Sequence, residues 1–150
     1  MAATGSSSPV ITAARFVISI DTVEVTFSEL TGINSEVEPV EYISTDATGK
    51  ILHTKQFGKT KPPKVTLKRG VDDSTKIWAW HQAVLMGDVT APKTCALKLQ
   101  DASGQTMITY ILENAWPSKV DIAGLKAGAS EVVMETVELV CDSILMQPGS

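Results

Sequence analysis

The segment Lys64–Leu85, KVTLKRGVDDSTKIWAWHQAVL, changes its hydrophobic period from that of a strand to that of a helix. Its first residues alternate apolar and polar side chains, which is typical of a strand with one buried face. Gly70 interrupts the alternation, and the acidic run after it supplies side chains that cap helix N-termini. The positions that follow form a stripe with helical spacing: Ile77, Trp80, His81, Val84 and Leu85. The segment predicts a helix at about residues 74–86 that docks on a sheet.

Most other apolar segments of the chain have the two-residue period of strands. They are residues 16–20, 23–27, 34–42, 95–99, 107–112 and 114–122. A turn is predicted at residues 101–104, and Pro39 predicts an edge or a bulge in its strand. The spacing in residues 130–141 fits a helix or a strand, but the β-branched content favours a strand. We therefore expect a mainly β fold with about seven or eight strands and one helix.

The strand-like segments belong to one predicted domain, residues 14–145, between two tails. Residues 1–13 are small, polar and rich in Gly and Ser, which predicts a flexible tail, and residues 146–150 form a C-terminal tail. Within the domain, residues 44–63 are polar and end in two prolines, which predicts a long loop. A loop of this length in a compact domain usually has a function or is disordered.

The composition argues against several classes of function. Thirteen basic and 17 acidic residues give a net charge of −4, and no basic stripe suggests nucleic-acid binding. No apolar run approaches the ~20 residues of a membrane-spanning helix, and the N-terminus lacks the pattern of a signal peptide. Cys95 and Cys141 lie in apolar strand-like runs, so we expect buried free thiols. These features predict a soluble intracellular protein.

The sequence contains no recognisable set of catalytic or metal-binding residues. His53 and His81 are its two histidines, and no Cys, Asp or Glu has metal-ligand spacing from either. The common nucleophile, zinc-protease and nucleotide-binding motifs are absent. The pair Asp72-Asp73 is more simply a helix cap than a catalytic pair, and Glu135 and Glu138 are interpreted as part of a solvated or interface face. We expect no enzymatic activity, no metal and no cofactor.

The two tryptophans of the predicted helix lie at positions i and i+2 and cannot share one helix face. Trp80 and His81 belong to the stripe that packs on the sheet, with His81 at its boundary. Trp78 is left for a second packing surface, which suggests a neighbouring subunit. The alternative, a stacking platform for bases or sugars, would need both rings on one face.

Five ordered segments resemble the tail tube proteins, or inner tube proteins, of contractile phage tails and phage-tail-like contractile injection systems. They are FSELTGINSEVEPVEY (27–42), KQFGKTKPPKVTLKRG (55–70), KVTLKRGVDDSTKIWAWH (64–81), AWPSKV (115–120) and EVVMETVELVCDSI (131–144). The resemblance extends over about residues 16–144 in the right order. Residues 56–57, Gln-Phe, depart from the Leu-Pro that the family often has there.

The resemblance implies a β-sandwich or barrel-like tube-protein domain with one flanking helix. Family members form hexameric rings in which the inner strands of all subunits join one continuous β-barrel around a channel. The rings stack into a tube for cargo or DNA that a contractile sheath drives outward, with baseplate and tube-end proteins as further partners. Such a protein is assembled in the bacterial cytoplasm, as part of a phage tail or a phage-tail-like injection particle, and has no stable membrane insertion.

The resemblance also nominates two groups of assembly residues. In the family, the extension before the Thr-Leu-Lys-Arg-Gly strand reaches the adjacent ring, which makes residues 44–63 the expected inter-ring loop and residues 46–57 the expected stacking contact. The N-terminal and C-terminal tails are second candidates for this contact, and an ordinary mobile loop is the alternative. Its candidate residues are Asp46, Lys50, His53, Lys55, Gln56 and Phe57. The candidates for ring-interface or helix packing are Trp78, Trp80, His81, Lys68, Arg69 and Asp72. Lys68 and Arg69 are expected to pair with Asp72, Asp73 or a neighbouring subunit, or to be solvated.

Two other interpretations stay open at this point. A tube component of a type VI secretion-like system would need the same ring. A small monomeric β-barrel binding protein would need a cavity with a polar lining, which the sequence does not indicate.

Overall fold

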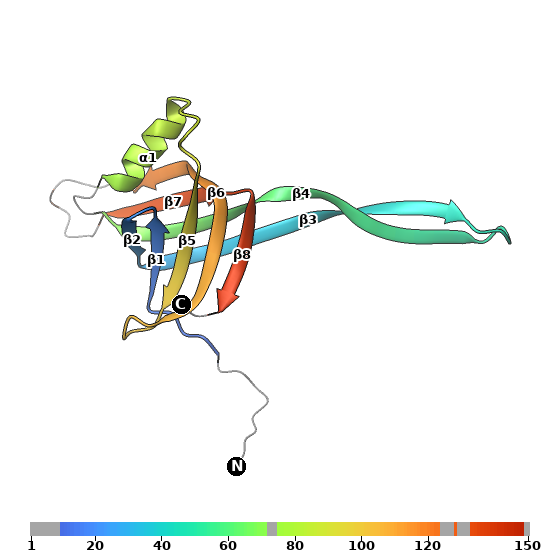
Figure 1. The fold of residues 1–150 in the computed structure, drawn as a ribbon, viewed down its shortest axis with the longest axis horizontal. Helices are drawn as coiled ribbons and strands as arrows, with labels where there is room; N and C mark the ends of the chain where they lie inside the picture. The colour runs from blue at the N-terminus through green and yellow to red at the C-terminus, as the bar shows by residue number, and fades with distance from the viewer. Residues whose placement is uncertain (1–9, 72–74, 124–127, 129–132, 149–150) are drawn as a thin grey trace, which may run out of the picture.

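The computed structural model describes residues 10–71, 75–123, 128 and 133–148. Within these residues the protein has eight strands and one helix (Figure 1). The strands are β1 (Arg15–Ile20), β2 (Val23–Phe27), β3 (Glu29–Thr45), β4 (Ile51–Gly70), β5 (Lys93–Gln100), β6 (Thr106–Ile122), β7 (Met134–Val140) and β8 (Ser143–Pro148), and the helix is α1 (Lys76–Leu85). The predicted fold class, mainly β with one flanking helix, is confirmed.

The strands form two layers that share β6. All pairs are antiparallel, in the order β2-β1-β5-β6-β7-β4-β3, with β8 also paired to β6. The first half of β6 pairs with β5 and β8, and its second half pairs with β7. Figure 1 shows β1, β5 and β8 running across the direction of β4 and β7. The buried side chains of both layers form one core, as in a β-sandwich: Ile18, Leu97 and Leu112 from one layer, Val65, Leu67 and Leu139 from the other.

β7 covers residues 134–140 of the segment whose spacing fitted a helix or a strand, residues 130–141; residues 130–132 lie outside the described residues. Its side chains alternate between buried and half-buried positions, so the β-branched content predicted a strand correctly. Glu135 points into the core, however, and is 4% exposed. The interpretation of Glu135 as part of a solvated or interface face is wrong.

A buried ion pair explains the position of Glu135. It lies opposite Arg69 in the register of β7 and β4, and Arg69 Nε and Nη2 each lie 3.0 Å from Glu135 Oε2. The guanidinium carbon of Arg69 also lies 5.9 Å from the centre of the Phe27 ring. Arg69 is 5% exposed, so it is a core residue and not a solvated one. The other partners predicted for it, Asp72 and Asp73, lie outside the described residues.

α1 spans Lys76–Leu85, within the predicted range, and Gly87 follows it with a φ of 76°. Three residues of the predicted stripe are buried as expected: Ile77, Trp80 and His81. Leu85 is 69% exposed, so the predicted stripe is wrong in its last turn. The reason is that the C-terminal turn of α1 extends away from the sheets (Figure 1). The predicted capping residues, 72–74, lie outside the described residues.

The prediction of a long loop at residues 44–63 is wrong. β3 and β4 pair along this segment as far as Thr45 and Ile51, so the turn between them is short. Asp46 Oδ1 accepts hydrogen bonds from the backbone N–H groups of Thr48 and Lys50, both at 2.9 Å, and from the Thr48 hydroxyl at 2.6 Å. Neither face of this part of the hairpin is buried. Its apolar and polar residues therefore do not alternate, and the segment resembles a loop in sequence.

The predicted C-terminal tail begins too early. β8 pairs with β6 as far as Pro148, which lies opposite Ile108, so residues 146–148 belong to the sheet. Residues 10–13 precede β1 and have no helix or strand. The rest of the two predicted tails, residues 1–9 and 149–150, lies outside the described residues.

Both cysteines are free and buried, as predicted. Burial raises the pKa of Cys95 to about 12 and that of Cys141 to about 11. Because the thiolate is the reactive form, we expect very slow maleimide labelling of the folded protein at about pH 8, and rapid labelling in denaturant. Rapid labelling under native conditions would contradict this assignment.

The same two pKa shifts predict a loss of stability in alkali. Unfolded thiols ionise near pH 8.5, whereas the folded thiols stay protonated to about pH 11–12. The folded state therefore binds more protons than the unfolded state in this window, and the free energy of unfolding falls as pH rises through it. Urea titrations below and above the window measure the effect, with a Cys95→Ala variant expected to show a smaller loss.

Candidate assembly surfaces

The outer part of the β3–β4 hairpin projects from the body as a two-stranded ribbon, which we call the arm (residues 36–61; Figure 1). β4 pairs with β7 only from Lys64 onward, and in the described part of the chain no third strand pairs with the arm. Both edges and both faces of the arm are therefore open. An isolated two-stranded hairpin is only marginally stable in water, so the arm has the properties of an element that needs a partner.

Opposite charges favour one register of the arm. Its acidic residues, apart from Asp46 at the turn, lie on β3, and the basic residues of its paired strands lie on β4. Lys61 Nζ lies 3.2 Å from Glu36 Oε1, and His53 Nδ1 lies 2.8 Å from Glu41 Oε1. Each pair is exposed and contributes little to stability, but opposite charges on paired strands favour this alignment over a slipped one.

A bulge lies in the arm beside Pro39. The register shifts between Val37 and Pro39, as the proline predicted. A Cβ atom on Gly58 would lie 2.5 Å from the Glu38 carbonyl oxygen and 2.6 Å from Val40 Cγ2. The two strands approach this closely only because residue 58 has no side chain.

Large apolar side chains on the arm are exposed to solvent. Phe57 is 97% exposed, and Ile43 and Ile51 are each 62% exposed. The other members of this set are Val37, Val40, Tyr42 and Leu52. Exposed apolar residues gathered on one element mark a contact site for another protein. The arm is therefore the strongest candidate for an assembly surface.

The structure brings all six predicted stacking residues onto the arm. Asp46 and Lys50 lie at the turn, and the others follow on β4: His53, Lys55, Gln56 and Phe57. The exposed apolar residues beside them were missed by the sequence analysis, because the segment was interpreted as a loop. A signal for the hairpin was present, since DATGK (46–50) and DASGQ (101–105) are closely similar. In both, an Asp carboxylate accepts the same pattern of hydrogen bonds across a short turn.

α1 is fixed to the body by two buried hydrogen bonds. Trp80 Nε1 donates to the Ala91 carbonyl at 2.6 Å, and His81 Nδ1 donates to the Pro117 carbonyl at 2.8 Å. Trp78 does not lie on this buried face and is 48% exposed. The two tryptophans thus differ as the spacing predicted: Trp80 packs against the body, and Trp78 presents half of its surface to solvent.

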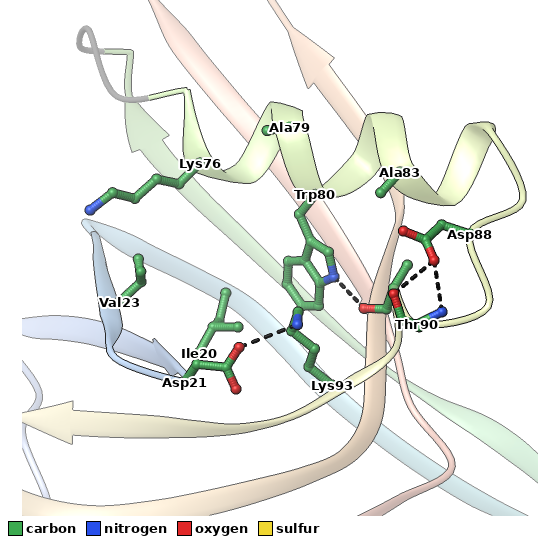
Figure 2. Close-up of a pocket in the computed structure, with 11 residues that line it drawn as sticks. Ile20, Asp21, Val23, Lys76, Ala79, Trp80, Ala83, Asp88, Thr90 and Lys93 are labelled. Atoms are coloured by element: carbon green, nitrogen blue, oxygen red, sulfur yellow. Dashed lines mark hydrogen bonds and ion pairs between the residues drawn. The ribbon is translucent and has the colours of Figure 1, made fainter.

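A cavity of about 340 Å³ lies beside Trp80, between α1 and the β1–β2 turn (Figure 2). Its lining is largely apolar and includes Ile20, Val23 and Ala83. At its rim, Asp21 and Lys93 pair with each other at 3.2 Å. The cavity can accept an apolar side chain. Two of its lining residues form a turn, in which Asp88 Oδ1 accepts hydrogen bonds from the Thr90 hydroxyl at 2.7 Å and from the Thr90 backbone N–H at 2.9 Å (Figure 2).

The outward face of the β6-β7-β4-β3 layer is polar. Along β4, Lys64, Thr66 and Lys68 alternate with buried core residues. Lys64 Nζ lies 3.6 Å from Glu138 Oε1 on β7, and Lys68 lies opposite Glu29 in the register of β3. Lys68, a predicted ring-interface residue, is thus part of this face, whereas the predicted Asp72 lies outside the described residues.

Two further kinds of site find no support in the described part of the chain. No group of three or more His, Cys, Asp and Glu side chains is placed to hold a metal ion. The described helix is too short to cross a membrane.

The β-sandwich, its projecting arm and its flanking helix define a structural protein of the tail tube class. The sequence profile described as T4-like virus tail tube protein gp19 matches residues 12–144, and the chain belongs to this family. No curated protein sequence matches it.

Solved structures with this fold include chains of contractile injection particles and an Hcp protein. A chain of the PVC sheath-tube complex, from an extracellular contractile injection system in the extended state, is 22% identical with a TM-score of 0.76, covering 93% of this chain and 92% of that one. A chain of the anti-feeding prophage cap is also 22% identical with a TM-score of 0.76, covering 98% and 96%. Hcp1 from Flavobacterium johnsoniae is 14% identical with a TM-score of 0.52, covering 90% and 96%.

The family makes this chain a tail tube protein, and its fold is shared with the tube proteins of contractile injection systems and with Hcp proteins. The role of this class is structural. The sequence thus predicted the fold of the class, but it did not predict the strand conformation of the arm.

Proposed function

We propose that six copies of the chain form a ring with a central channel, and that the rings stack into the inner tube of a contractile injection apparatus. The observation that carries the proposal is the arm, a ribbon with exposed apolar residues that projects from the body (Figure 1). A projecting element that binds a different surface of the next copy makes a head-to-tail contact. Contacts of this kind propagate into open stacks.

The β6-β7-β4-β3 layer is the candidate for the channel wall. It has four strands, so six copies would contribute roughly 24 strands, and about 16–18 already leave an aqueous channel. Its outward face carries charges of both signs, including Lys64 and Lys68 as well as Glu29 and Glu138. A mixed wall of this kind suits a conduit that passes protein cargo or DNA without binding it strongly.

The arm is the candidate for the contact between rings. The predicted stacking residues from Asp46 to Phe57 would act together with the exposed apolar residues of the same ribbon. The alternative of an ordinary mobile loop gives no reason for apolar side chains such as Ile51 and Phe57 on paired, exposed strands.

Trp78 is the candidate for a lateral contact near α1. A Trp78→Ser substitution is expected to lower the free energy of unfolding of the isolated chain by less than about 1 kcal/mol, because the residue is 48% exposed. It is expected to weaken ring formation by about 2 kcal/mol or more if the indole is buried between copies. The matched Trp80→Ser substitution should instead cost about 3–5 kcal/mol of folding stability. Urea titration and sedimentation measure the two effects, and unchanged assembly of Trp78→Ser would remove this residue from the interface.

The partners follow from the same proposal. The similar solved chains come from a sheath-tube complex, a tube terminating cap and a baseplate. We infer that this chain likewise contacts a contractile sheath protein along the tube and baseplate or tube-end proteins at its ends. Assembly in the bacterial cytoplasm is part of the proposal.

The mass of the assembled species tests the ring. A hexamer has a mass of about 96 kDa, six times the 16.0 kDa of one chain. Mass photometry or native mass spectrometry of dilute protein should find this species, and larger ones should be multiples of it. A trimer, an octamer or a persistent monomer would contradict six-fold rings.

A tube component of a type VI secretion-like system is the second candidate. The fold similarity favours the contractile injection particles, since the TM-score is 0.76 for the PVC chain and 0.52 for Hcp1. A monomeric binding protein is the third candidate and would use the cavity beside Trp80. It has less support, because a ligand site in the body gives no reason for the exposed apolar residues of the arm.

A further inference from the structure

The register of the arm assigns each of its side chains to one of two faces. From the pair Pro39–Phe57 to the pair Thr45–Ile51 the strands pair without a shift, and residues opposite each other in an antiparallel pair lie on the same face. One face carries Val40, Tyr42, Ser44, Leu52, Thr54 and Gln56. The opposite face carries Pro39, Glu41, Ile43, Thr45, Ile51, His53, Lys55 and Phe57.

Each face carries large apolar side chains that are exposed. On the first face, which bears no charge, Tyr42 is 54% exposed and Val40 is 48% exposed. On the second face, Phe57 is 97% exposed and Ile51 is 62% exposed. A ribbon that lies on a single surface buries only one of its faces. Contact with one surface would therefore leave a second apolar face in water.

We propose that the arm inserts between two other copies of the chain, which cover its two faces. This inference rests on the proposed stacking of rings and specifies its geometry: one arm bridges two neighbouring subunits of the adjacent ring. The arm carries four acidic and four basic residues between positions 36 and 61, so its formal charge is zero. It can therefore enter a crevice between two copies of a chain of net charge −4 without net repulsion.

The charges of the arm also fit two different neighbours on its two edges. Apart from Glu36 and Glu41, whose side chains contact Lys61 and His53 across the arm, Glu38 lies on β3, and Lys55 and Lys59 lie on β4. A crevice between two copies of one chain has two unlike walls, because each copy presents a different side to it. A partner with a single uniform surface, such as a sheath protein on the outside of a tube, would match only one edge and one face.

Adjacent residues on β4 provide a matched test, because Ile51 and Leu52 point to opposite faces of the arm. The variants Ile51→Cys and Leu52→Cys are labelled with maleimide in the unassembled fraction and in pelleted tubes. The native Cys95 and Cys141 are buried and give little background. The proposal predicts that both new thiols react about tenfold or more slowly in tubes than in the unassembled protein.

Different outcomes separate this inference from the function on which it rests. If tubes form and only one of the two thiols is protected, the arm docks on one surface and the inference is wrong, while the tube function stands. If both thiols stay fully reactive in tubes, the arm is not an assembly contact at all. If the unmodified chain forms no rings or tubes, the proposed function itself fails.

Substitution by aspartate gives an independent readout of the same geometry. Ile51→Asp and Leu52→Asp each place a charge on one face, outside the hydrophobic core, and each alone is expected to abolish tubes seen by electron microscopy. Unchanged melting of both variants shows that the body is folded. Tubes of normal length from either variant would overturn insertion between two copies.

Discussion

Shortening the arm is expected to abolish tubes and leave the body folded. The suitable deletion removes residues 40–56, because Pro39 and Phe57 lie opposite each other and can be joined by an Asn-Gly turn. None of the residues of the hydrophobic core lies in the deleted segment, so thermal unfolding should change little. Electron microscopy and pelleting of the variant should show rings or monomers without stacks.

This deletion removes paired residues from both strands of the arm, so the residues that remain keep their partners. Removing only Asp46–Gln56 would take away β4 residues and leave Val40–Thr45 of β3 without their partners. Such a variant can fail to stack because of an unpaired strand and not because of a lost contact. Tubes of normal length from the symmetric deletion would contradict the role of the arm, whatever the behaviour of the asymmetric one.

Breaking the buried ion pair is expected to have the largest effect on folding. Arg69→Met leaves Glu135 buried without its counter-ion, and Glu135→Gln removes the carboxylate charge that lies 3.0 Å from the buried guanidinium. Loss of one partner from a buried pair costs about 3–5 kcal/mol, because the remaining charge is desolvated without compensation. Urea titration of the isolated chain measures this cost as a shift of the unfolding midpoint.

A double variant and a surface control make the cause specific. Arg69→Met combined with Glu135→Leu removes both charges and should be more stable than either single variant. Lys64→Met breaks an ion pair whose lysine side chain is 56% exposed, and should cost less than about 1 kcal/mol. If the two core substitutions are simply additive, or no more costly than Lys64→Met, Arg69 and Glu135 do not form the pair described.

Local sequence patterns predicted those parts of the fold that have one buried face. The alternation in β2 and β5 reflects side chains that point alternately to the core and to solvent. In β1, Ile18 and Ile20 are buried as the pattern predicted, but Val17 is buried as well. The helical stripe predicted α1 because Ile77, Trp80 and His81 meet the sheet. The two cysteines were recognised as core residues for the same reason.

The same reasoning failed for the arm, which has no buried face, and for Arg69 and Glu135, whose contact depends on pairing between distant strands. The arm has no core of its own, so β3 and β4 lose the two-residue period in the segment that was interpreted as a loop. The partnership of Arg69 and Glu135 depends on the pairing of β4 with β7, which joins residues 66 positions apart. The alternation within β7 shows which residues share a face of the strand with Glu135. Only the pairing of β7 with β4 shows that Arg69 lies opposite it.

The candidate assembly residues show a similar division. The resemblance to tube proteins located the stacking segment correctly in the chain, but not its strand conformation or its apolar residues Ile43, Ile51 and Leu52. The exposure of Trp78 followed from its helical spacing with Trp80. The contacts that these residues make in the assembly depend on other copies of the chain.

Electron microscopy of the purified chain distinguishes a tube subunit from a monomeric protein. We expect hollow tubes built from stacked rings, with six-fold symmetry in end views and density for each arm reaching into the adjacent ring. A monodisperse 16.0 kDa monomer at concentrations up to the solubility limit, with no rings or rods on the grid, would contradict it.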